Sequence, residues 1–120
     1  MLSSGILEIF LQFTAQIKLY HWQTKNYSRH KASDELFGKI QDLIDSFVET
    51  YQGSYERIYL KKDTKIPLYN LTDNDIRNYV IEFRDFLMDD LDNIKNSDLL
   101  NIRDEILATL NQTLYLFTLN

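Results

Sequence analysis

The sequence of 120 residues contains no cysteine, one proline and three glycines. Without cysteine there is no disulfide framework, thiolate metal site or cysteine nucleophile, so a bound metal must rest on histidine, carboxylate and water. The scarcity of glycine and proline argues against β-hairpin folds, which need these residues at their turns, and favours long helices. A basic surface is also missing, because the formal net charge is -5. We therefore do not expect nucleic acid as a partner, since that binding comes mainly from clustered lysine and arginine.

Long hydrophobic runs and a secretory signal are missing as well. The apolar N-terminal segment is interrupted by Glu8 and lacks a basic start and a small-residue cleavage site. No apolar run approaches the roughly 20 residues that a membrane-spanning helix needs. We expect a protein without a membrane segment, located in the cytoplasm or elsewhere inside a cell.

Hydrophobic residues recur at helical spacing in four segments. They predict helices over residues 2–25 (from Leu2), 28–60, 72–94 and 97–117. Asn26 is expected to end the first helix in a left-handed conformation, and Ser28 to cap the second. Thr72 and Asp75 form a carboxylate version of the capping box at the start of the third helix. One apolar face per helix predicts a single all-α domain over residues 1–120.

The predicted connections differ in length. The first and third are short, which indicates two antiparallel helical hairpins. Residues 61–71, which include Pro67, could stretch to roughly 36 Å, and a third helix of about 23 residues is roughly 35 Å long. This pattern predicts a ferritin-like four-helix bundle with a long crossover between its second and third helices. The alternative is a simple up-and-down bundle with a loose middle loop.

Five residues could carry metal chemistry. His21 and His30 flank the short first connection and should lie close together, while Asp34, Asp45 and Glu49 follow along the second helix. The spacing His-x3-Asp-x10-Asp-x3-Glu places the last four within a sector of roughly 100°, beside the apolar arc. Asp34 and Asp45 are about 16 Å apart at 1.5 Å per residue, so one chain cannot bring both to one small site.

The two ligand pairs share a midpoint. The midpoint of Asp34 and Asp45 is also that of His30 and Glu49, and it falls between residues 39 and 40. If the second helix packs antiparallel against its own copy about this point, His30 and Asp34 face Asp45 and Glu49 of the other chain, twice over. The spacing therefore predicts a two-fold dimer.

Gly38 lies in the same sector of the second helix. A glycine within a helix costs about 1 kcal/mol relative to alanine, and here it would let two backbones approach closely. Imidazole and carboxylate ligands at such an interface suit Fe(II), Mn(II) or Zn(II). We expect a homodimer through the second helix around Gly38.

The segment YHWQTKNYSRHKASDELFGKIQDLIDSFVE, residues 20–49, resembles the ferroxidase segment of the Dps family of ferritin-like mini-ferritins. In that family His-Trp ends the first helix, and the same four-ligand spacing runs along the second. The resemblance implies an iron-binding protein that oxidises Fe(II) with peroxide or O2 between two subunits. Its implied ligands come from one chain (His21, His30 and Asp34) and from the partner (Asp45 and Glu49), with Trp22 beside them.

The resemblance further implies iron, Fe2+ or Fe3+, as the bound metal, with Mn2+ or Zn2+ as substitutes. It leaves open whether dimers assemble into a higher oligomer. The lysine-rich tail with which family members bind DNA is absent from this sequence.

Each candidate residue also has a purely structural interpretation. His30 with Asp34 can form an ordinary first-turn ion pair, Asp45 with Glu49 a solvated face, and His21 a core histidine. Packing is expected for Trp22 and for a stripe of tyrosines (Tyr51, Tyr55 and Tyr59). A solvated face is expected for the acidic residues of the third helix (Asp85, Asp89, Asp90 and Asp92). The corresponding function is a non-catalytic helical-bundle dimer that serves as a structural or interaction module.

Overall fold

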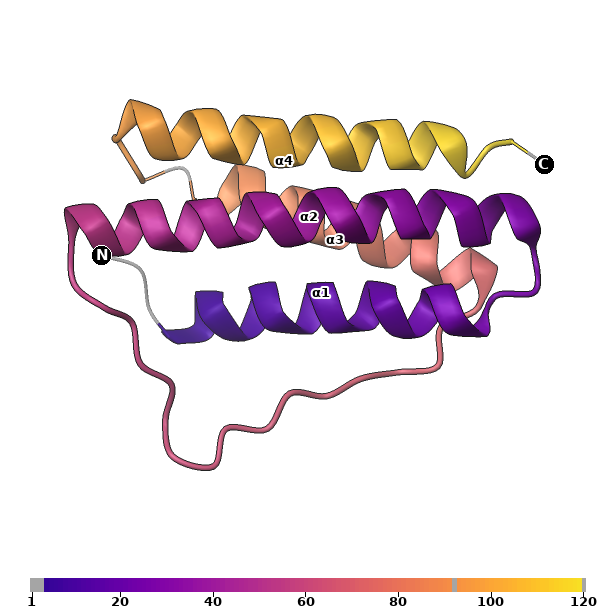
Figure 1. Cartoon of the computed structure of the whole chain (residues 1–120), viewed down its shortest axis with the longest axis horizontal. Coiled ribbons are helices and arrows are strands. Elements are labelled where there is room, and N and C mark those ends of the chain that lie inside the picture. The colour runs from indigo at the N-terminus through magenta and orange to yellow at the C-terminus, as the bar shows by residue number, and fades with distance from the viewer. Residues whose placement is uncertain (1–3, 92, 120) are drawn as a thin grey trace.

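The computed structural model describes residues 4–91 and 93–119, and within them the chain forms four helices (Figure 1). They are α1 (Ser4–Gln23), α2 (Tyr27–Ser54), α3 (Asp73–Asp89) and α4 (Ser97–Leu116). No strand occurs among these described residues. The predicted all-α class is confirmed.

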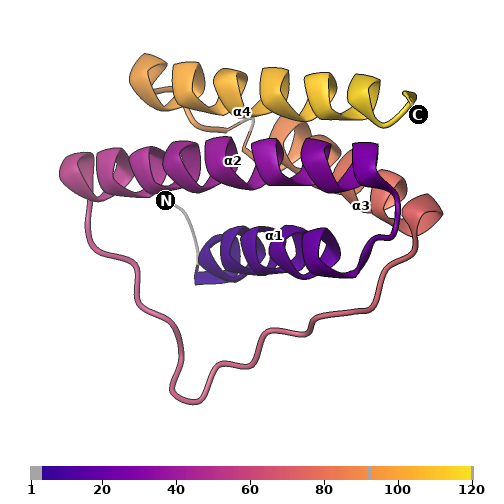
Figure 2. The same cartoon turned by 45° about the vertical axis from the view of Figure 1, so that its right-hand side comes forward.

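The connections are short, long and short, over residues 24–26, 55–72 and 90–96. In both views the segment 55–72 runs along the outside of α1 from one end of the bundle to the other (Figures 1 and 2). As a result α3 begins at the same end of the bundle as α2. This is the predicted crossover connectivity, and it excludes the up-and-down alternative.

Glutamines of α1 hold the end of this long connection. The side-chain amide of Gln16 is fully buried, accepts a hydrogen bond from the backbone N–H of Tyr69 and donates one to the Tyr69 carbonyl, both at 2.8 Å. Gln12 donates to the carbonyl of Pro67 at 2.9 Å. The Gln16 side chain thus pairs with both backbone polar groups of Tyr69, and this fixes the end of the connection to α1.

Aromatic side chains fill the middle of the core. The rings of Phe13 and Phe83 stack with centroids 3.9 Å apart, and Phe10 meets Phe47 edge-on at 5.6 Å. The Tyr79 ring also stacks on Phe13, with centroids 5.7 Å apart. Burying several large rings together supplies much of the apolar area that a 120-residue bundle has to bury.

The start of α2 differs from the prediction. Asn26, not Ser28, is the N-cap, and its side chain accepts a hydrogen bond from the backbone N–H of Arg29. Asn26 has φ -93°, so it does not adopt the left-handed conformation expected at the end of the first helix. Asparagine favours the N-cap as strongly as serine does, and here the earlier residue takes that position. The predicted capping box of Thr72 and Asp75 at the start of α3 is confirmed.

Three helix ends were predicted too far along the chain. The first helix ends at Gln23, and the Leu2 at which it was expected to begin lies outside the described residues. The second ends at Ser54 instead of residue 59 or 60, since Gly53 and Ser54 are weak helix formers. The third ends at Asp89 instead of residue 94, because further acidic residues would meet the negative end of the helix dipole.

Among the described residues, no helix is both long and apolar enough to cross a membrane.

Candidate metal centre

His21 from the last turn of α1 and His30 from the first turn of α2 lie face to face. Their rings stack with centroids 4.0 Å apart and planes 20° from parallel. The predicted proximity of the two histidines is confirmed. His21 is 9% exposed, and the ring of His30 is partly buried.

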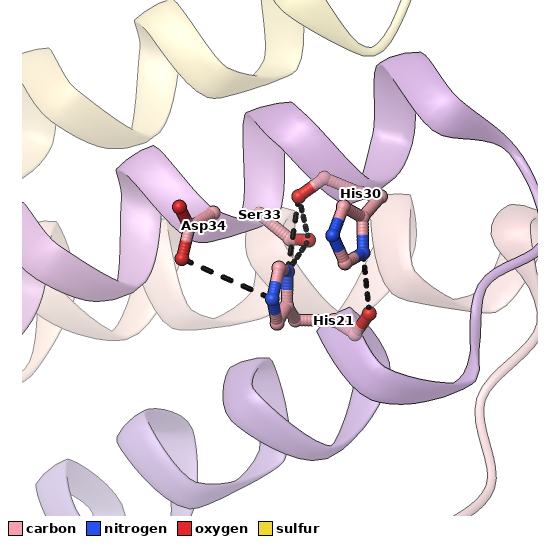
Figure 3. A network of polar contacts seen from close by, with 4 residues as sticks. All are labelled: His21, His30, Ser33 and Asp34. Carbon is pink, nitrogen blue, oxygen red and sulfur yellow. Dashed lines mark hydrogen bonds and ion pairs between the residues drawn. The ribbon is translucent and has the colours of Figure 1, made fainter.

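The two rings are held by crossed hydrogen bonds. Nδ1 of His21 lies 3.0 Å from the carbonyl oxygen of His30, and Nδ1 of His30 lies 3.0 Å from the carbonyl oxygen of His21 (Figure 3). A carbonyl oxygen can only accept, so each Nδ1 carries the hydrogen and each neutral ring keeps its lone pair on Nε2. Histidines that bind metals are typically held in this way, through the nitrogen that does not bind the metal.

Asp34 completes one half of the predicted ligand set. Its Oδ1 lies 3.9 Å from Nε2 of His21, and its side chain is 65% exposed. Two atoms bound to one metal at about 2.1 Å each lie at most about 4.2 Å apart, so this spacing is compatible with a shared ion. Within the described part of the chain, the imidazole within 4.0 Å of the Asp34 carboxylate is that of His21, and not that of His30 as the structural interpretation expected.

Ser33 lies beneath the two rings and was not identified from the sequence. Its side chain is fully buried, donates to the carbonyl of His30 at 3.1 Å, and lies 3.4 Å from Nδ1 of His21. Figure 3 shows Ser33 and Asp34 on adjacent positions of α2 beside the His21 ring. The available signal was a small polar residue three positions after a candidate ligand, on the side of the helix that faces α1.

Arg29 anchors the turn that carries both histidines. It donates to the carbonyl of Asp73 at 2.7 Å and to that of Phe117 at 3.2 Å, and its guanidinium lies 4.3 Å from the Phe117 ring. The first bond reaches the start of α3, and the second reaches the C-terminal end of α4, where a cation is favoured. The sequence gives no signal for these contacts, since they depend on how α3 and α4 fold back.

Tyr20 ties α1 to the same place. Its hydroxyl donates to Oδ1 of Asp73 at 2.5 Å, and Thr24 donates to the same oxygen at 3.0 Å. Burial raises the pKa of Tyr20, and the hydrogen bond to Asp73 raises it further, so the phenol keeps its proton. Three helices thus meet next to His21, which fixes the imidazole pair at one end of the bundle.

Asp45 and Glu49 lie elsewhere, farther along α2. Both are exposed. Asp45 lines a groove of about 380 Å³ on the outer face of α1 and α2, together with Leu7, Leu11, Ile44 and Val48 among others. Within the described residues of one chain, no group of three or more histidine, aspartate or glutamate side chains could hold a metal ion. Asp45 and Glu49 thus lie apart from the histidine pair, and His21, His30 and Asp34 of one chain do not form such a group by themselves.

The remaining candidates fall into two groups. Trp22 is 68% exposed and Tyr59, which lies in the long connection, is 77% exposed, so the described residues do not bury them as the packing interpretation expected. Tyr51 is buried, with its ring 4.8 Å from that of Tyr55.

The acidic residues of the third predicted helix are largely solvated. Asp85 is half-buried beside Arg84, and Asp92 lies outside the described residues.

Residues 21–117 match the family described as "Family of unknown function (DUF5856)". The chain belongs to this family. The match begins at His21 and contains both halves of the candidate site.

A relative from Enterobacteria phage T4, the "Uncharacterized 14.6 kDa protein in mobD-ri intergenic region", is 51% identical over 39 residues. The aligned part is 32% of this chain and 30% of the phage protein, so the similarity spans less than a third of either chain. No solved structure gives a significant match to the chain.

Proposed function

We propose that this protein is a Dps-like homodimer that binds Fe(II) at two sites between its subunits and oxidises it to Fe(III) with peroxide or O2. The observation that carries the proposal is the crossed pair of histidine hydrogen bonds. The two Nε2 atoms and the Asp34 carboxylate, which lies 3.9 Å from Nε2 of His21, would supply half of each coordination sphere. The resemblance of residues 20–49 to the Dps ferroxidase segment points to the same ligands.

The second half of each site would come from Asp45 and Glu49 of the partner. Together with Asp34 these give three carboxylates around each ion, a donor set that offsets the charge of Fe(III) as it forms. The iron is both substrate and redox centre. Each peroxide takes up two electrons and two protons to become two waters, so it oxidises two Fe(II) ions. The chain supplies ligands in fixed positions and excludes part of the solvent.

Metal and dimer are linked in this proposal. Without metal, the dimer brings Asp34 of one chain close to Asp45 and Glu49 of the other, and their like charges oppose association. A bound cation removes that repulsion, so Fe(II) should strengthen the dimer. We place the protein in a reducing compartment inside a cell, where Fe(II) is available.

The experiment is an anaerobic Fe(II) titration followed by peroxide. Trp22 is the only tryptophan and is adjacent to His21, so its fluorescence reports on metal binding, and ferric absorbance reports on oxidation. The doubly substituted variant Asp45→Asn with Glu49→Gln should lose both signals. The matched control Glu35→Gln with Asp42→Asn, two exposed acids of the same helix, should keep them. Unchanged Fe(II) uptake by the first variant would refute the proposal.

The second candidate function is a helical dimer that binds no metal and acts as a structural or interaction module. The exposed Trp22 and the groove beside Asp45 favour this candidate, because such surfaces support association without metal. A wild-type dimer that takes up no Fe(II) and gives no ferric absorbance after peroxide would select it.

A further inference from the structure

The outer face of α1 and α2 carries apolar side chains that none of the described residues covers. Leu11 is 49% exposed and Trp22 is 68% exposed, and both project from the same stripe of α1 as Lys18. Leu7 and Leu11 form one wall of the groove, whose other wall on α2 contains Ile44 and Val48. An exposed apolar surface beside a ligand residue is typical of an interaction site.

The register of the two helices places Leu11 at the centre of the predicted dimer. His21 stacks on His30, so these residues are level along the bundle. Because α1 runs opposite to α2 (Figure 1), residue 11, ten positions before His21, is level with residue 40, ten positions after His30. Residue 40 adjoins the midpoint of the four-ligand pattern. Consider a two-fold axis at that level that lies in the plane of this face and crosses both helices. Such an axis packs α2 of one copy against α2 of the other, and α1 against α1.

The same register gives complementary charges. Lys18 is level with residue 33 of α2, so the two-fold places it level with residue 46 of the partner, between Asp45 and Glu49. Its ammonium lies 4.6 Å from the Phe37 ring and 5.7 Å from the Trp22 ring, which keeps the charge on this face. Phe37 belongs to α2, so the Lys18 ammonium reaches from α1 across to α2. A cation in one half of the face therefore meets the acidic half of α2 in the other copy.

We propose that α1 forms half of the dimer interface: Leu11 of the two copies packs together on the two-fold axis, and Lys18 of each copy lies against the acidic half of its partner. This inference deepens the proposed function, since it rests on the same two-fold dimer, but it concerns contacts that need no metal. The interface it describes unites the apolar groove, the exposed Leu11 and the ligand halves in one surface.

Cysteine cross-linking tests the position of Leu11, because the natural chain has no cysteine. Leu11→Cys should form a covalent dimer rapidly with a short thiol-specific cross-linker in metal-free buffer. Met88→Cys is the matched control, since Met88 on α3 is 43% exposed and lies off this face. Dimer formation should be at least about tenfold faster for Leu11→Cys than for the control, as expected for neighbouring thiols held together by association.

Charge reversal tests Lys18 independently. Lys18→Glu should weaken metal-free dimerisation about tenfold in sedimentation, because it sets a third like charge against Asp45 and Glu49 of the partner. Lys95→Glu makes the same charge reversal at an exposed residue between α3 and α4, and it should leave dimerisation unaltered. Circular dichroism confirms that each variant folds, and Gln41→Cys, at an exposed position of α2 that lines the same groove, provides a second cross-linking position near the same level.

The outcomes are distinguishable from those of the iron experiment. Equal cross-linking of the Leu11 and Met88 variants, or a dimer that forms while Leu11→Cys and Gln41→Cys both fail to cross-link, overturns the inference. Equal dimerisation of Lys18→Glu and Lys95→Glu overturns the charge pairing. Efficient cross-linking through Leu11 in a protein that takes up no Fe(II) upholds the interface and refutes the metal function.

Discussion

His21 and His30 each present Nδ1 to the backbone carbonyl oxygen of the other, at 3.0 Å in both directions. This reciprocal contact fixes both ring orientations and both tautomers at once. The two Nε2 atoms take no part in these bonds, and that of His21 lies 3.9 Å from the carboxylate of Asp34.

The first prediction concerns this pair. His30→Ala removes one Nε2 ligand and leaves the carbonyl of His21 without its donor, so Fe(II) affinity should fall by at least about a hundredfold. Trp22 fluorescence during an anaerobic titration measures the affinity. Ser33→Ala removes only the hydroxyl beneath the rings and should weaken binding by about tenfold. Equal affinities for wild type and His30→Ala would show that the imidazoles are not ligands.

The second prediction concerns Gly38. A Cβ added there meets nothing within 4 Å among residues 4–91 and 93–119. Gly38→Ala should therefore raise the free energy of unfolding of the monomer by about 1 kcal/mol. It should also weaken the dimer by about tenfold or more, because the added methyl lies where two backbones approach. Denaturant unfolding at low protein concentration and sedimentation measure the two effects.

Gly53→Ala is the control for that experiment. Gly53 also has open space around an added Cβ, but it lies at the far end of α2. Its substitution should stabilise the chain without changing dimerisation. If both glycine variants dimerise as the wild type does, the crossing near Gly38 is wrong.

The third prediction concerns the long connection. Gln16→Ala leaves the N–H and the carbonyl of Tyr69 without these partners at a partly buried position, and should lower the free energy of unfolding by about 2 kcal/mol. Gln12→Ala, which removes one exposed bond to Pro67, should cost only about 0.5 kcal/mol. Urea denaturation compares the two. Similar losses would mean that the connection is not held mainly through Gln16.

The fourth prediction follows from Tyr79. Burial raises its pKa to about 12 from the ordinary 10.0, and the nearby charge of Glu82 adds to the effect. Between pH 10 and 12 the unfolded chain loses the phenolic proton while the folded chain keeps it, so stability falls as pH rises through this range. The contribution lost should be about 2 kcal/mol.

Tyr79→Phe removes that proton, so its stability should fall less steeply than that of the wild type between pH 10 and 12. Tyr115→Phe, at a phenol of α4 that is 63% exposed, serves as the control. Parallel pH profiles for wild type and Tyr79→Phe in urea denaturation would contradict the assignment.

Much of the fold was predictable because it depends on local periodicity. The four apolar stripes, the capping box at Thr72 and the long middle connection are all visible in the sequence, and the structure contains them. Helix ends were less predictable, since Asn26 and Ser28 are both good N-caps and only the packing of the turn decides between them. The acidic end of α3 ends the helix even though Leu91 beyond it is buried.

The candidate site was predictable only in part. Helical spacing was enough to place His21 beside His30 and to separate Asp34 from Asp45. The crossed bonds were not predictable, because they depend on the exact positions of two backbone carbonyls at a turn. The contact of Asp34 with His21 in place of His30 depends equally on how α1 and α2 pack. The contacts of Arg29 join residues as far apart as Asp73 and Phe117, which periodicity does not relate.

Mixing two defective variants tests the central claim most directly. One variant carries His30→Ala and Asp34→Ala, and the other carries Asp45→Ala and Glu49→Ala. If each site takes its two halves from different chains, neither variant binds Fe(II) alone, but a mixed dimer has one complete site. Random mixing of equal amounts should then restore about a quarter of the wild-type Fe(II) capacity. No recovery in dimers shown to have exchanged subunits, or full binding by either variant alone, would contradict a site shared between two chains.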